Sequence, residues 1–227
     1  MIKTGKSELA VIRTHVFSSD RLFLEADLYE GGCDWLILIH GKAYDKEVWK
    51  HSLILHPIVQ AGWSVLAPNL RGYGASESGD SFYEKDVLGA IQFAETHKAE
   101  RVVILGASMG GTAALKALAQ LEQPLAGVIL VSPAGHPDSF SQLTNKAKRA
   151  LLLYSDDEAY ADNCRLVREQ LPLPLATHTW PGRLHAHQLL DDPGYGPEVT
   201  NWIVRFLASI AASSQPDDNQ SYTNTQG

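Results

Sequence analysis

A serine flanked by glycines is the residue in this sequence best placed for covalent chemistry. Ser108 stands in Gly106-Ala-Ser-Met-Gly110, between an apolar run at 102–105 and a helix-favouring run at 112–121. This strand, turn and helix context predicts a turn so tight that the serine backbone is strained and its hydroxyl stands clear of a sheet. Glycines are expected beside it because the packed chains leave no room for a Cβ atom. The N–H groups that begin the helix would stabilise negative charge on a substrate oxygen.

Further polar residues follow other predicted strands. A serine nucleophile needs a base to take its proton and a carboxylate to orient that base. In open α/β sheets, ligands bind outside the carboxyl ends of the strands. The polar residues at such ends are His40, Ser108, His136, Asp156 or Asp157, and His185. They supply candidates for a nucleophile, an acid and a base.

The elements that must position these residues alternate along the chain. Two alternating segments at 8–17 and 20–29 predict an antiparallel hairpin. Apolar runs predict further strands, and segments with helical spacing predict helices between them. The expected strands are at 35–39, 63–68, 102–105, 126–131, 149–154 and 175–180, and the expected helices at 46–61, 81–97, 112–121, 159–170 and 197–212. This order predicts an α/β fold, with a mostly parallel sheet of about eight strands and helices on both faces.

Composition limits the other possibilities. The chain has 227 residues, enough for one large domain, and we expect a single domain at 1–212 and a polar, disordered tail at 213–227. A formal charge of -7 argues against nucleic acid and anionic membranes as partners. The two cysteines and the nine histidines form no metal-ligand spacing, so neither a metal nor another cofactor is expected. With no secretory or membrane-spanning pattern, the expected location is cytoplasmic.

Taken together, these motifs resemble the α/β-hydrolase superfamily, in particular its compact members similar to dienelactone hydrolases and carboxylesterases. The resemblance covers residues 8 to about 212. It depends on His40-Gly41 after the third predicted strand, Asn69-Leu-Arg-Gly-Tyr-Gly-Ala-Ser76 after the fourth, the glycines around Ser108, an aspartate after the run at 149–154, and a late histidine. Serine, acid and histidine also follow one another in the chain order of that superfamily.

The resemblance implies a role for each candidate residue. Ser108 would be the nucleophile, Asp157 the acid and His185 the base, with Asp156 and His187 as the alternatives for the last two. The oxyanion hole would use the backbone N–H groups of Lys42 and Met109. Glu158 would be a helix N-terminal residue that interacts with the helix dipole, and His40 would hold the loop backbone.

The implied activity is acyl transfer to water through a Ser-His-Asp triad, as in a carboxylesterase. Only about 16 residues separate Ser132 from Arg149, too few for a sizeable cap domain, so an open pocket for a small acyl substrate is expected. Thioesters, lactones and peptides remain alternative substrates. A catalytically silent scaffold that binds a ligand or a protein partner is the alternative of another class.

Overall fold

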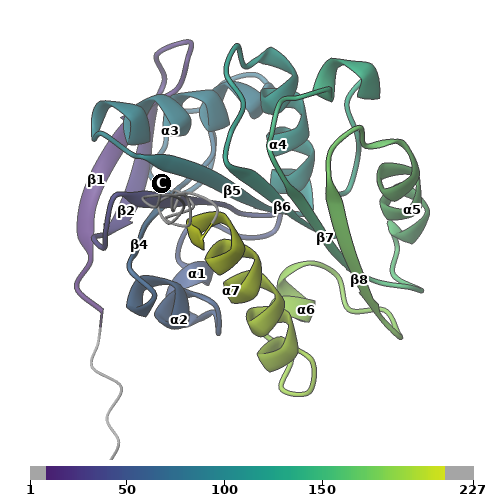
Figure 1. Ribbon diagram of the computed structural model, residues 1–227. Helices are drawn as coiled ribbons and strands as arrows, with labels where there is room; N and C mark the ends of the chain where they lie inside the picture. The colour runs from purple at the N-terminus through teal and green to yellow at the C-terminus, as the bar shows by residue number, and fades with distance from the viewer. Residues whose placement is uncertain (1–8, 213–227) are drawn as a thin grey trace, which may run out of the picture.

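Strands and helices alternate along the chain much as the apolar pattern predicts. The computed structural model describes residues 9–212 (Figure 1). The strands are β1 (Ile12–Phe17), β2 (Phe23–Tyr29), β3 (Asp34–Ile39), β4 (Trp63–Pro68), β5 (Arg101–Ala107), β6 (Gly127–Val131), β7 (Ala150–Ser155) and β8 (Leu175–Trp180). The helices are α1 (Val48–His51), α2 (Leu55–Gln60), α3 (Glu84–Thr96), α4 (Met109–Gln120), α5 (Ala161–Gln170), α6 (His187–Leu190) and α7 (Gly196–Ala212), with a 3₁₀ turn η1 (Phe140–Leu143).

All eight strands form one sheet in the order β1-β2-β4-β3-β5-β6-β7-β8. β1 pairs with β2 and β2 with β4 in antiparallel fashion, which confirms the expected hairpin. Every other neighbouring pair is parallel. The carboxyl ends of β3, β5, β7 and β8 therefore meet at one edge, where a site is expected in a sheet of this kind.

Helices cover both faces of the sheet because its central strands are apolar on both sides. In β5, Ile104 packs into the core beneath α3, α4 and α5, whereas Leu105 packs into the core beneath α1, α2, α6 and α7. Both side chains are fully buried. Figure 1 shows α3 and α4 on one side of the sheet and α2 and α7 on the other. Burial on both faces explains the continuous apolar runs that distinguish these strands from the alternating hairpin.

The segment at 46–61, where Pro57 interrupts the helical spacing of the sequence, is divided at a different position. It forms two short helices, α1 and α2, separated where Ser52 takes an extended conformation with ψ 143°. The Ser52 hydroxyl donates a hydrogen bond of 2.7 Å to Asp191, which holds the break against the loop before α7. Pro57 does not cause the interruption. It lies in the first turn of α2, where its missing N–H would have no helical acceptor.

The tail expected at 213–227 lies outside the described residues. Within residues 9–212, none of the helices combines the length and the apolar character needed to cross a bilayer.

Candidate active site

Ser108 lies at the turn between β5 and α4. Its φ is 54° and its ψ is -116°, a strained conformation for a residue with a side chain. The turn is possible because two glycines bring the strand and the helix together. A Cβ atom at Gly106 would lie 2.5 Å from the Gly110 carbonyl oxygen, and one at Gly110 would collide with the Ile39 carbonyl. The sharp turn predicted from the glycine pattern is present.

His185 faces Ser108 from the loop after β8. Its Nε2 atom lies 2.7 Å from the Ser108 Oγ, a hydrogen-bond distance, although the two residues are 77 positions apart in the chain. About a quarter of the His185 side chain is exposed, so the imidazole borders on solvent. The structure thus brings together the serine and the histidine that the sequence predicts.

Glu158, and not Asp157, is the carboxylate that contacts His185. The Nδ1 atom of His185 lies 2.8 Å from the Glu158 Oε2. The same oxygen accepts a 2.8 Å hydrogen bond from the Tyr160 N–H, and the Cys164 Sγ lies 3.6 Å from the other oxygen. The Glu158 side chain is fully buried. A buried carboxylate that accepts a bond from Nδ1 fixes the ring orientation and leaves Nε2 for the serine.

Asp157, the predicted acid, has a different partner and is not placed against His185. Asp157 is 67% exposed and forms a 2.7 Å ion pair with Arg183. Its alternative, Asp156, accepts a 3.0 Å hydrogen bond from the Gly182 N–H. Strand β7 continues to Ser155, one residue beyond the predicted end, and the turn after it directs both aspartates to the loop after β8. Glu158, expected at a helix N-terminus, lies three residues before α5 and contacts the Tyr160 N–H and His185.

The Gly41 loop lies beside the serine. A Cβ atom at Gly41 would be 3.3 Å from the Ser108 Cβ. Lys42 follows Gly41, and Met109 is the first residue of α4, directly after the serine. Within the part of the chain that the structure describes, neither the Lys42 nor the Met109 amide donates a hydrogen bond. Amides of this kind are available to a substrate oxygen.

Two buried histidines form hydrogen bonds with the backbone of this loop. His40 donates from Nδ1 to the Gly41 carbonyl at 2.9 Å and accepts at Nε2 from the Leu70 N–H at 3.1 Å. This confirms the expected role of His40 in holding the loop backbone. His187, the alternative base, is 2% exposed, and its Nε2 lies 3.3 Å from the Gly41 nitrogen. Among the described residues it is His185, and not His187, that is hydrogen-bonded to Ser108. Burial lowers the pKa of both imidazoles, that of His187 to about 3.

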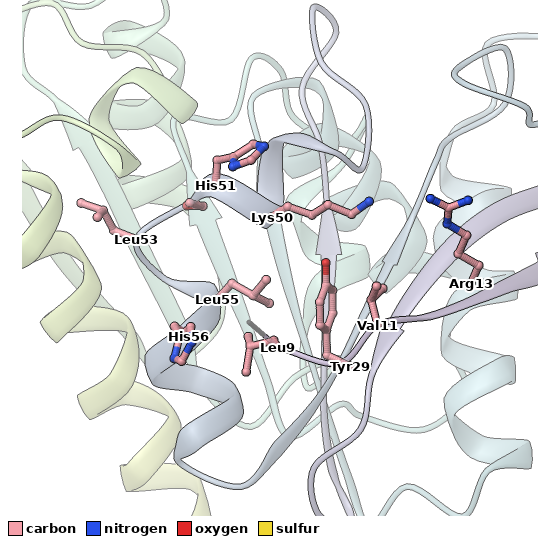
Figure 2. A pocket seen from close by; sticks show the side chains of 10 residues that line it. Leu9, Val11, Arg13, Tyr29, Lys50, His51, Leu53, Leu55 and His56 are labelled. Carbon is pink, nitrogen blue, oxygen red and sulfur yellow. The ribbon is translucent and has the colours of Figure 1, made fainter. Parts of the chain in front are cut away.

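A cavity of about 280 Å³ opens beside Ser108. Its walls come from the Gly41 loop, the start of α3, the first turns of α4 and the loop after β6, and include Lys42, Thr112 and Tyr160. A second cavity, of about 670 Å³, lies away from the serine against β1, β2 and the α1–α2 segment (Figure 2). Ser108 lines only the first of the two, so chemistry at its hydroxyl belongs to the smaller cavity.

Metal chemistry has no evident ligand set here. Among residues 9–212, no group of three or more histidine, cysteine, aspartate or glutamate side chains is placed to hold a metal ion.

Comparisons with known proteins agree with this architecture. Residues 34–194 match the family model described as alpha/beta hydrolase fold. Protein ABHD14A of Danio rerio is 30% identical over 104 residues, an alignment that covers 44% of this chain and 38% of that protein. The chain therefore matches well under half the length of this curated relative.

Solved structures with the same fold include several esterases. An esterase of Pyrococcus furiosus superposes with a TM-score of 0.74 at 13% identity, over 88% of this chain and 91% of its own. A predicted CIB-like hydrolase of Thermoplasma acidophilum gives 0.71 at 20% identity, over 88% and 99%. Est1E of Butyrivibrio proteoclasticus, solved with ferulic acid bound, gives 0.71 at 16% identity, over 87% and 99%. At these identities the likeness concerns the fold.

Proposed function

The chain belongs to the α/β-hydrolase fold family, and we propose that within it this protein is a serine hydrolase that cleaves an ester-type acyl bond. The observation that carries the proposal is the continuous hydrogen-bonded series from Ser108 Oγ through His185 to Glu158, at 2.7 Å and 2.8 Å. Each member has the chemical character that its place demands: a hydroxyl on a strained turn, an imidazole bordering on solvent, and a buried carboxylate.

The proposed reaction has two halves. Ser108 Oγ attacks the substrate carbonyl while its proton passes to His185 Nε2, and Glu158 stabilises the imidazolium that forms. The amides of Lys42 and Met109 donate to the tetrahedral oxyanion. The ester oxygen then leaves with the proton from His185, and Ser108 holds the acyl group. In the second half, water loses a proton to His185, attacks the acyl carbon, and the carboxylic acid departs as Ser108 regains its proton.

The size of the site favours a small acyl group. A cavity of about 280 Å³ lies just below the range of about 300–1,000 Å³ that holds drug-sized ligands. Between β6 and β7 the described chain has only the short turn η1, which leaves no room there for an inserted cap domain. We therefore expect acetyl and butyryl esters to react faster than long-chain ones.

Hydrolysis of p-nitrophenyl esters of increasing acyl length by the purified protein tests the proposal. We expect turnover of the acetyl ester, a decline in kcat/KM with chain length, and loss of at least about 10³-fold in Ser108→Ala. Acetyl thioester and lactone substrates in the same series establish which acyl bond is preferred. If the folded protein shows the same rate as Ser108→Ala on every substrate, the chain is not a serine hydrolase.

A further inference from the structure

His187 stands two residues after the proposed base, but it faces a different part of the site. The separation comes from Ala186, whose φ of 47° and ψ of -105° nearly repeat the values of 54° and -116° at Ser108. The hydrogen bonding is also the same, because the carbonyl of each residue accepts from the N–H groups three and four positions later. The chain thus has a second strained turn, which directs His185 to the serine and His187 to Gly41.

The contact with Gly41 fixes one peptide plane. Peptide groups are planar, so only φ and ψ of Gly41 set the orientation of the next N–H, that of Lys42. Glycine is the residue with the widest choice of φ and ψ, and its freedom must be removed by outside contacts. His187 Nε2 accepts from the Gly41 N–H at 3.3 Å and holds the plane before Gly41.

The carbonyl oxygen of the plane after Gly41 has contacts of its own, which fix the oxygen but not by themselves the N–H of the same plane. The Gly41 carbonyl accepts from His40 Nδ1 at 2.9 Å and from the Tyr44 N–H at 3.2 Å. Together with the contact at the Gly41 N–H, they determine the direction of the Lys42 N–H. That N–H is one of the two donors proposed for the oxyanion.

The surroundings of His187 keep its Nε2 atom unprotonated. The ring packs between Tyr44 and Trp49, with centroid distances of 4.4 Å and 4.6 Å. Burial in this aromatic environment lowers the pKa of His187 to about 3, so the ring is neutral at pH 7. A neutral ring that accepts at Nε2 carries its proton on Nδ1, and within residues 9–212 that buried atom has no hydrogen-bond partner. An unpaired buried donor costs free energy, so stability alone does not explain a histidine here.

We propose that His187 is a positioning residue of the oxyanion hole, which acts by accepting the Gly41 N–H at Nε2 and thereby orienting the Lys42 amide toward the tetrahedral intermediate. The inference rests on the proposed hydrolase function. It assigns His187 a role in stabilising the transition state rather than in binding substrate or transferring protons.

Two substitutions distinguish the effect of the hydrogen-bond acceptor at Nε2 from the effect of the volume of the ring. In His187→Gln the amide oxygen can reach the position of Nε2, whereas His187→Phe keeps an aromatic ring and removes the acceptor. Because misplacement of a catalytic group by about 1 Å can cost about 10²-fold, we expect kcat of the acetyl ester to fall between about tenfold and 10²-fold in His187→Phe, with KM within about twofold of wild type. We expect His187→Gln to recover most of the loss.

Ile58→Ala serves as the matched control. Ile58 is fully buried in the same core as Trp49 but belongs to α2, so its truncation lowers stability without touching the Gly41 loop. Thermal unfolding of all variants shows that each is folded at the assay temperature. Equal kcat in wild type and His187→Phe overturns the inference, as does an equal loss of kcat in Ile58→Ala. If the wild type itself does not turn over any ester, it is the hydrolase function that fails.

A spectroscopic measurement on the wild-type protein tests the inference without depending on activity. In a long-range ¹H–¹⁵N spectrum of histidine-labelled protein at pH 7, with His187→Gln used for assignment, we expect His187 to be neutral, with the proton on Nδ1 and an unprotonated Nε2. A signal that shows protonated Nε2 would contradict the inference, because that atom could not accept from Gly41.

Discussion

Replacing Glu158 by glutamine tests which carboxylate supports the histidine. The substitution preserves size and removes the charge. The Tyr160 N–H, which donates 2.8 Å to Oε2, requires an acceptor at that position, so the amide oxygen is expected there. It can still accept from His185 Nδ1, and the ring keeps its tautomer. What is lost is the negative charge that faces the imidazolium in the transition state.

The size of the loss follows from that charge. With 2.8 Å between Nδ1 and Oε2, the charge centres of the imidazolium and the carboxylate are separated by about 4 Å. At the effective dielectric constant of about 20 that suits protein sites, their attraction is about 4 kcal/mol. At about 1.4 kcal/mol for each factor of ten, kcat/KM should fall by about 10³-fold in Glu158→Gln.

The neighbouring Asp157→Asn is the matched control. Asp157 is 67% exposed and its partner Arg183 is 82% exposed. The change therefore removes a solvated ion pair that does not contact His185. We expect kcat/KM within about twofold of wild type. The assay is p-nitrophenyl acetate hydrolysis by both variants, with thermal unfolding to show that each is folded. A folded Glu158→Gln of near wild-type activity, or a large loss in Asp157→Asn, would refute the assignment of Glu158.

Three other consequences are open to direct measurement. Burial lowers the pKa of His187 from 6.5 to about 3, so between pH 7 and pH 5 this residue takes up a proton only on unfolding. His187 alone should therefore lower the free energy of unfolding by about 2 kcal/mol from pH 7 to pH 5, and His187→Gln should reduce the observed fall in urea titrations. Cys33 is exposed, whereas Cys164 is buried with a raised pKa, so a disulfide reagent should titrate one thiol in the native chain and two in urea. Gly106→Ala, whose Cβ would lie 2.5 Å from the Gly110 carbonyl oxygen, should lower the free energy of unfolding by about 2 kcal/mol or more in the same titrations, and a change below about 0.5 kcal/mol would contradict the close packing at the turn.

Local patterns predicted the features that depend on neighbouring residues. The alternating segments located β1 and β2, and the apolar runs located the other strands that the structure describes, because burial on one or both faces leaves a direct mark on the sequence. The glycines around Ser108 predicted the strained turn, since the lack of room for a Cβ atom is also a local requirement. His185 could be predicted as the base because it follows a late parallel strand, whose carboxyl end lies at the same edge of the sheet as Ser108.

Contacts between distant segments were harder to predict. Which residue after β7 faces His185 depends on the loop after β8, where Gly182 and Arg183 hold the two aspartates and leave Glu158 for the histidine. Only aspartates were predicted as the acid, so Glu158 was not identified from the sequence, although glutamate can serve as the triad acid in this fold. The contact between Gly41 and His187 spans 146 positions and depends on the conformation of Ala186, which no local pattern indicates.

Labelling with a fluorophosphonate probe is the most direct test of an activated serine. The probe reacts with a serine whose hydroxyl is deprotonated by a base, and mass spectrometry of the digested protein identifies the modified residue. We expect an adduct on Ser108 that is absent from Ser108→Ala and that forms much more slowly in His185→Ala and in Glu158→Gln. If the folded wild-type protein forms no adduct, or if Ser108→Ala is labelled as well as the wild type, Ser108 is not an activated nucleophile.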